Sequence, residues 1–96
     1  MFILILKYLE PLPAIENALA AHMDYLEKYY VQGKFIASGP QNPRTGGAIL
    51  CLAQNRREVE SIIKEDPFYS RKLAAYEILA FTPTKCSPEL ELLLAP

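Results

Sequence analysis

The segment PAIENALAAHMDYLEKYYVQG, residues 13–33, organises the rest of the sequence and contains its only histidine. Read with the 3.6-residue period of an α-helix, its apolar side chains fall on one stripe, and most charged side chains fall elsewhere. This pattern predicts one amphipathic helix that ends at Gly33, where a missing Cβ tolerates a positive φ. The predicted stripe consists of Ile15, Leu19, His22, Leu26, Tyr29 and Tyr30.

Four segments rich in apolar residues predict β-strands, at residues 2–9, 34–38, 48–53 and 75–81. The first and third hardly alternate between apolar and polar residues, which is typical of strands covered on both faces. Gly39-Pro40 is expected to end the second strand, and the polar residues 41–45 predict an exposed loop.

A second helix and a short helical turn are expected between the last two strands. Asn55 and Glu58 have the spacing of a capping box, and the residues after them carry an apolar stripe. Asp66-Pro67 has the form of an N-cap followed by proline at the first helical position.

The predicted element order is β-α-β-β-α-β in a single domain of residues 1–96. This order predicts an α+β, ferredoxin-like fold with two helices on one face of a four-stranded antiparallel sheet. The bare sheet face then needs a partner, and homodimerisation through it is the simple solution. Residues 84–96 are expected to form a C-terminal tail or short helix, whose leucines also need cover, for which a second subunit is the candidate.

Composition excludes several classes of function. The net charge of −1, without a basic stripe, argues against nucleic-acid binding. No segment has the length of a membrane span or the form of a signal peptide, so a cytoplasmic protein is expected. One histidine and two separated cysteines make a soft-metal site improbable, and no cofactor motif is present.

His22 is the first candidate for chemistry. It is either a buried histidine with a structural hydrogen bond or a general acid/base at the edge of a cavity. A general base needs a partner for its second ring nitrogen, and Asp66 is the best candidate for that partner. The alternative for Asp66 is a plain helix cap, although one carboxylate has enough acceptor positions for both roles.

Three further residues are candidates for substrate binding. Ser38 offers a hydroxyl, and Gly39 allows a ligand to approach the backbone closely. Both are equally well explained as residues of a turn. Arg44 in the polar loop is placed to meet an anionic substrate, but most exposed arginines are simply solvated.

Several short motifs, in this order and spacing, resemble the YCII-related (YciI-like) family over residues 1–83. They are His22 with Tyr25-Leu26, then Gly33, Ser38-Gly39-Pro40, Gly46-Gly47 and Asp66-Pro67-Phe68. The resemblance implies a ferredoxin-like fold paired into a dimeric α+β barrel. It also implies a pocket with a histidine–aspartate pair, matching His22 and Asp66, and a rim formed by Ser38 and Gly39. One branch of the family eliminates chloride from a chlorinated hydroxyhydroquinone, and nothing in this sequence points to that branch.

The resulting hypothesis is a cofactor-independent enzyme of lyase or isomerase type that acts on a small organic molecule. His22 is expected to be the general acid/base, with Asp66 orienting it. The rival hypotheses are a non-catalytic module that binds a small ligand and a plain dimerisation scaffold.

Overall fold

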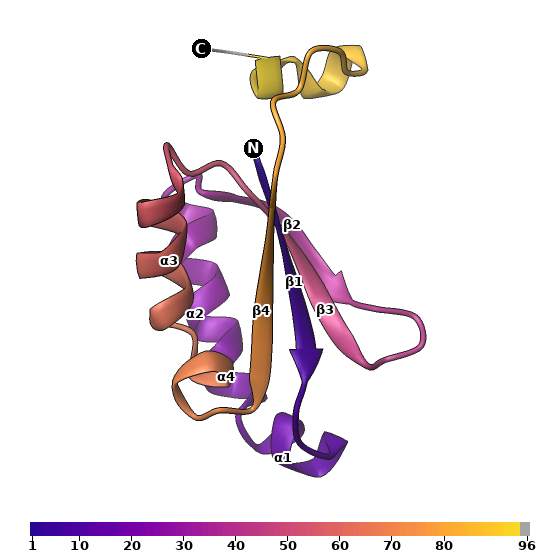
Figure 1. Cartoon of the computed structure of the whole chain (residues 1–96), viewed down its shortest axis with the longest axis vertical. Coiled ribbons are helices and arrows are strands. Elements are labelled where there is room, and N and C mark those ends of the chain that lie inside the picture. Colours follow the sequence, from indigo (N-terminus) through magenta and orange to yellow (C-terminus); the bar gives the residue numbers. More distant parts are fainter. Residues whose placement is uncertain (95–96) are drawn as a thin grey trace.

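The computed structural model describes residues 1–94, and all statements on the structure refer to them. It contains one sheet and two layers (Figure 1). The elements are β1 (Phe2–Tyr8), α1 (Leu12–Asn17), α2 (Leu19–Val31), β2 (Phe35–Pro40), β3 (Gly46–Cys51), α3 (Arg56–Lys64), α4 (Pro67–Ser70), β4 (Ala74–Ala80) and the 3₁₀-helix η1 (Pro88–Leu94).

The four strands form one antiparallel sheet in the order β2-β3-β1-β4. Helices α2, α3 and α4 lie on one side of this sheet, and the other side is bare (Figure 1). The predicted α+β, ferredoxin-like arrangement is therefore confirmed. Within one chain β2 and β4 are free edges, so the sheet is open and its hydrogen bonds do not close a barrel.

The central strand β1 shows how the two sheet faces differ. Phe2, Leu4 and Leu6 point toward the helices and are buried, whereas Ile3 and Ile5 point to the bare face and are half-buried. Successive side chains of a strand alternate between faces, so only one set can reach the helices. The expectation that inner strands are covered on both faces is not met within one chain, because all the long helices lie on the same side.

The predicted single helix over residues 13–33 is broken at Ala18, which separates α1 from α2. The break changes the phase of the buried stripe. Ala18 is 2% exposed, while Leu19, which the uninterrupted pattern placed in the stripe, is 37% exposed. Asn17 lies directly before the break, and asparagine competes with helical hydrogen bonding through its own side chain.

Two predicted helix caps are present. The amide of Glu58 donates to Asn55 Oδ1 over 2.9 Å at the start of α3, but the Glu58 carboxylate accepts from the amide of Gln54, so the capping box is not reciprocal. At α4 the amide of Phe68 donates to Asp66 Oδ1 over 2.9 Å. The second cap fixes the position of the Asp66 carboxylate at the start of α4.

Ser38 lies in β2 as expected, but Gly39 and Pro40, which were expected to end the strand, also belong to it. Proline lacks an amide donor, and an edge strand tolerates this because one of its sides is unpaired. Gly46, which was expected to lie before β3, is its first residue. A Cβ at Gly46 would lie 1.8 Å from the carbonyl oxygen of Leu6, so only glycine allows β3 to pair this closely with β1.

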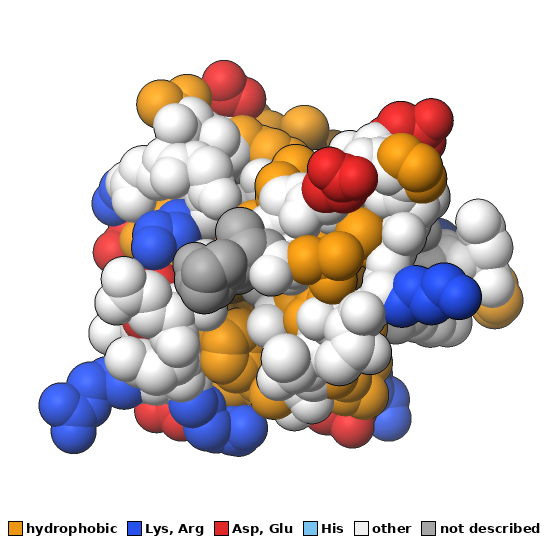
Figure 2. Space-filling model, turned by 90° about the horizontal axis from the view of Figure 1, so that it is seen from above, with side chains coloured by type: hydrophobic (Ala, Val, Ile, Leu, Met, Phe, Trp, Pro, Cys, Tyr) orange, Lys and Arg blue, Asp and Glu red, His pale blue; other side chains and the backbone are white. Residues whose placement is uncertain are grey.

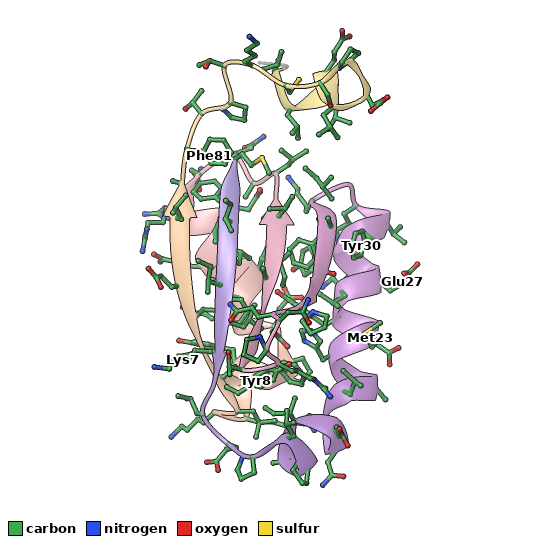
Figure 3. The ribbon with its side chains drawn as sticks, turned by 90° about the vertical axis from the view of Figure 1, so that its right-hand side faces the viewer. Lys7, Tyr8, Met23, Glu27, Tyr30 and Phe81 are labelled. Carbon is green, nitrogen blue, oxygen red and sulfur yellow. The ribbon has the colours of Figure 1, made fainter. Side chains whose placement is uncertain are left out.

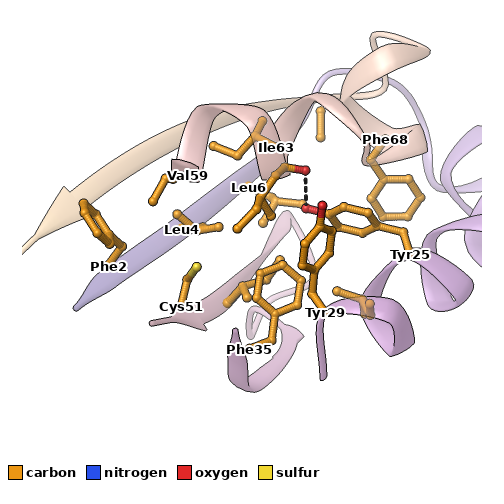
Figure 4. Packing of buried hydrophobic residues seen from close by; sticks show 14 of the residues in the cluster. Phe2, Leu4, Leu6, Tyr25, Tyr29, Phe35, Cys51, Val59, Ile63 and Phe68 are labelled. Atoms are coloured by element: carbon orange, nitrogen blue, oxygen red, sulfur yellow. Dashed lines mark hydrogen bonds between the residues drawn. The ribbon is translucent and has the colours of Figure 1, made fainter. Parts of the chain in front are cut away.

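The core fills the space between the sheet and the helices (Figure 4). Aromatic rings from α2 pack against the first residue of β2, with Tyr25 and Tyr29 both in contact with Phe35. The Tyr25 hydroxyl donates to the carbonyl oxygen of Ile62 over 2.9 Å, the bond drawn dashed in Figure 4. The last turn of α3 is thereby tied to the middle of α2.

The chain after β4 leaves the body as an extended segment and ends in η1 (Figure 1). Met1 and Phe81 exchange two backbone hydrogen bonds of 2.9 and 3.0 Å at its root. The leucines of η1 are partly exposed, and apolar side chains lie at the surface of this end beside acidic ones (Figure 2). Residues 95 and 96 of the predicted tail lie outside the described residues.

Candidate functional site

His22 lies in the first turn of α2, on the side that faces the sheet, and is 8% exposed. Its ring stacks on that of Phe68, with centroids 3.9 Å apart and an angle of 3° between the planes. Phe68 belongs to α4, so the stack holds the imidazole between two helices. This contact restricts the ring to a single plane.

Asp66 is fully buried, and its Oδ1 lies 2.7 Å from Nδ1 of His22. Because an ionised carboxylate can only accept, this geometry places the proton on Nδ1 when the imidazole is neutral. The lone pair then resides on Nε2. No hydrogen bond joins Nε2 to residues 1–94, and no buried side-chain nitrogen or oxygen in that range lacks a partner. Nε2 is therefore accessible.

Tyr76 is the third partner of the Asp66 carboxylate. Its hydroxyl donates to Oδ2, while Oδ1 accepts from both His22 and the amide of Phe68. Burial, and next the charge of Asp66, raises the pKa of Tyr76, which keeps the hydroxyl in its donating form. Tyr76 is not among the residues predicted from the sequence, since a tyrosine in an apolar strand carries no signal beyond packing.

A cavity of about 330 Å³ opens beside His22, between α2, α4 and the strands β1, β2 and β3. Figure 3 shows two of its lining residues, Tyr8 at the end of β1 and Met23 on α2. Its walls are largely apolar. The residues with polar side chains that line it are Tyr8, His22, Ser38 and Arg44.

Ser38 and Gly39 both line this cavity. Ser38 pairs with the buried Ile49 across β2 and β3, so it lies on the helix side of the sheet. Its hydroxyl is 2.7 Å from that of Tyr30, and either oxygen can be the donor. A Cβ built at Gly39 would meet no atom within 4 Å, so this position has open space around it.

Arg44 lies in the loop between β2 and β3 and also lines the cavity. Its Nη1 donates to Glu16 Oε1 of α1 over 3.3 Å. The pKa of Arg44 is raised mainly by the Tyr8 hydroxyl and to a smaller extent by the Glu16 carboxylate. With a side chain 36% exposed, the guanidinium lies between cavity and solvent.

The structure thus brings the five predicted site residues together. Four of them line one cavity, namely His22, Ser38, Gly39 and Arg44, and the fifth, Asp66, is hydrogen-bonded to His22. Residues 1–94 contain no cluster of three or more side chains suited to hold a metal ion, and no helix there is long and apolar enough to cross a membrane. The arrangement is that of an α+β protein with a buried acid that orients a histidine beside an apolar pocket.

The chain belongs to the YCII-related family: the model of the YCII-related domain matches residues 1–82. Comparison with curated proteins gave no match. Among solved structures, the chain is similar to 5-chloro-2-hydroxyhydroquinone dehydrochlorinase (TftG) from Burkholderia phenoliruptrix AC1100, in complex with 2,5-dihydroxybenzoquinone. The TM-score is 0.70 at 27% sequence identity, and the match covers 84% of this chain and 93% of that chain.

Proposed function

We propose that this protein is a cofactor-independent enzyme of lyase or isomerase type that acts on a small organic molecule. One observation carries the proposal: His22 is bound through Nδ1 to a fully buried carboxylate, while its Nε2 remains accessible beside a cavity. This is the arrangement that a general acid/base requires, because the carboxylate sets the tautomer and stabilises the imidazolium once it forms.

In this mechanism Nε2 of His22 takes a proton from the bound molecule. In an elimination, the electron pair left behind forms a double bond and expels a leaving group from the neighbouring atom. In an isomerisation, the imidazolium returns the proton at another atom. Asp66 stays ionised and offsets the positive charge of the ring throughout.

Ser38, Gly39 and Arg44 hold the substrate in this mechanism. The Ser38 hydroxyl and the backbone at Gly39 bind a substrate oxygen, and Arg44 attracts negative charge on the molecule. A cavity of about 330 Å³ is at the lower end of the range for ligand pockets, which suits a single-ring molecule. The similarity to a dehydrochlorinase in complex with a dihydroxybenzoquinone supports the same substrate size and a lyase-type reaction.

We also propose that two copies pair through the bare sheet face. Ile3, Ile5 and Leu50 present half-buried apolar side chains on this face, and Leu79 is 45% exposed beside them. The charged side chains of Lys7 and Glu77 lie on the same face, toward the Tyr8 end of β1, so the apolar patch is centred on Ile3. An exposed apolar patch with a polar rim is typical of a protein–protein contact. A second copy offers the same apolar surface, so the face is self-complementary in chemistry.

The test is a turnover assay on a panel of hydroxylated and halogenated single-ring compounds, with product detected by mass spectrometry. We expect the unmodified protein to convert at least one compound, and His22→Asn to lose about 10²- to 10⁴-fold in kcat. Circular dichroism should show that the variant is folded. Val31→Asn on the exposed end of α2 is the control and should keep its activity, since Val31 is 78% exposed.

Two outcomes would contradict the proposal. If His22→Asn converted the compounds as fast as the unmodified protein, His22 would not be the acid/base. If compounds bound in the cavity but were never converted, the protein would be a ligand-binding module instead.

A further inference from the structure

The Asp66 carboxylate is held by donors from three separate elements. His22 Nδ1–H approaches from α2, the amide of Phe68 from α4, and the hydroxyl of Tyr76 from β4. The two oxygens are not used equally, because Oδ1 accepts two of these bonds and Oδ2 accepts only that of Tyr76. Tyr76 is therefore the sole partner of Oδ2 within residues 1–94.

Rotation of the carboxylate about its last torsion has no strong intrinsic preference, because sp³–sp² torsions are broad. The donors around Asp66 must set its orientation instead. A buried carboxylate oxygen without a donor is also costly, since the lost hydration is not replaced. Without the Tyr76 hydroxyl, Oδ2 would be drawn toward the two donors that serve Oδ1, and the line from Oδ1 to Nδ1 of His22 would no longer be fixed.

The position of Tyr76 in the sheet holds its hydroxyl beside Asp66 Oδ2. Tyr76 pairs with Leu6 across β4 and β1, and both side chains lie on the helix side. Its ring meets Tyr69 of α4 edge to face, with centroids 6.2 Å apart. The nearby Tyr25 hydroxyl already donates to the carbonyl of Ile62, which leaves the Asp66 contact to Tyr76.

We propose that Tyr76 is a positioning residue: its hydroxyl fixes the Asp66 carboxylate so that Oδ1 holds the Nδ1–H of His22 and Nε2 is aimed into the cavity. This deepens the proposed function and rests on it for its catalytic consequence. The structural part, that the Tyr76 hydroxyl controls the His22–Asp66 bond, can be measured without any substrate.

The test compares Tyr76→Phe with Tyr69→Phe in isotope-labelled protein. The chain has one histidine, so the ring N–H signal in the nuclear magnetic resonance spectrum belongs to His22 alone. We expect the exchange of the Nδ1 proton with water to become at least about tenfold faster in Tyr76→Phe, consistent with the loss of about one hydrogen bond. Tyr69→Phe also removes a hydroxyl beside the network, but none that contacts Asp66, and should leave the exchange unchanged.

A second measurement follows turnover of the compound identified above. Tyr76→Phe should lower kcat by about 10- to 100-fold, the range known for the outer hydrogen-bond partners of metal-bound histidines. KM should change little, because Tyr76 does not line the cavity beside His22. Tyr69→Phe should leave kcat unchanged.

Unchanged exchange of the Nδ1 proton in folded Tyr76→Phe would overturn the proposal, even if turnover fell. If the unmodified protein converted no compound, the proposed function would fail, while the exchange rates would still decide the role of Tyr76. If Tyr76→Phe did not fold, the hydroxyl proton of Tyr76 in the unmodified protein would serve: protection from exchange supports the proposal, and free exchange overturns it.

Discussion

The buried phenols of Tyr25 and Tyr76 surround Asp66 and share its environment. Burial is the main cause that raises the pKa of each phenol, and the negative charge of Asp66 is the next. In the unfolded chain a tyrosine ionises near a pH of about 10. The folded state therefore holds protons that the unfolded state releases above that pH, and the free energy of unfolding must fall as the pH rises further.

This gives a prediction for an alkaline titration of Tyr76→Phe, followed by phenolate absorbance. Below the alkaline unfolding transition, the variant and the unmodified protein should show equal absorbance, because Tyr76 is not yet ionised. After unfolding, the phenolate absorbance of the variant should be lower by the contribution of one of the six tyrosines. A deficit already present in the folded state would show that Tyr76 ionises there.

His22 and Asp66 could be predicted from the sequence because each carries a local signal. The spacing of apolar residues places His22 within a helical stripe, and Asp-Pro is a typical start of a helix. Tyr76 could not be predicted, because its contact depends on how β4 is placed against α4. The pairing of Arg44 with Glu16 is equally a matter of tertiary structure, since a loop and a distant helix must first be brought together.

At the scale of elements, Lys34 and Glu58 connect the start of β2 to the first turn of α3. Lys34 Nζ lies 3.0 Å from Glu58 Oε1, and both side chains are about one-third exposed. The Lys34 ammonium, followed by the amide of Gln54, lowers the pKa of Glu58. A lowered folded pKa means that this contribution to stability is present above the unfolded value and is lost as the pH falls through the folded value.

Glu58→Gln should therefore lower the free energy of unfolding at pH 7 by up to about 1 kcal/mol. The difference from the unmodified protein should begin to narrow below a pH of about 4, where the carboxyl group of the unfolded chain takes up its proton, and should close once the pH is below the lowered pKa of Glu58 in the folded state. Urea unfolding at several pH values measures the loss of free energy at pH 7 and the way this difference changes with pH. Glu60→Gln on the same helix is the control, because its ion pair with Arg56 is more exposed. A difference that persisted at low pH would assign the effect to packing rather than charge.

The helices and strands could be predicted where the hydrophobic period and the capping residues indicated the same element. They could not be predicted where tertiary contacts determine the bounds of an element. All four strands and α3 follow from their patterns. The break at Ala18 does not, because the residues on both sides keep a helical spacing and only the docking of α2 reveals the change of phase. The composition of Gly39-Pro40 is that of a turn and predicts the end of β2 after Ser38, but an edge strand accepts the same residues.

At the scale of the whole molecule, one sheet face is covered by helices and the other is bare. Figure 3 looks onto the bare side, with β1 in front and Lys7 near its end. Within residues 1–94, η1 lies at the end of the sheet and does not cover this face (Figure 1). The proposed dimer uses this face.

Replacing Ile5 by glutamate in the middle of the bare face should abolish pairing. The new carboxylate would lie directly opposite Glu77 of β4, and burying these two like charges in the contact would cost several kcal/mol. Light scattering after size exclusion should give twice the 10.8 kDa of one chain for the unmodified protein and 10.8 kDa for Ile5→Glu. Val31→Glu adds the same charge on an exposed helix end and should remain paired. A single-chain mass for the unmodified protein would refute the dimer.

The three donors to Asp66 come from positions 22, 68 and 76, and this spread has a consequence for how the protein can be altered. The same carboxylate starts a helix, anchors the last strand and steers the imidazole. Under the proposed function, a substitution of Asp66 would therefore change reactivity and stability together. A substitution of Asp66 that releases His22 would also remove the contacts of Asp66 with α4 and β4. A change of reaction in this fold is therefore expected to start from substitutions of the residues that line the cavity.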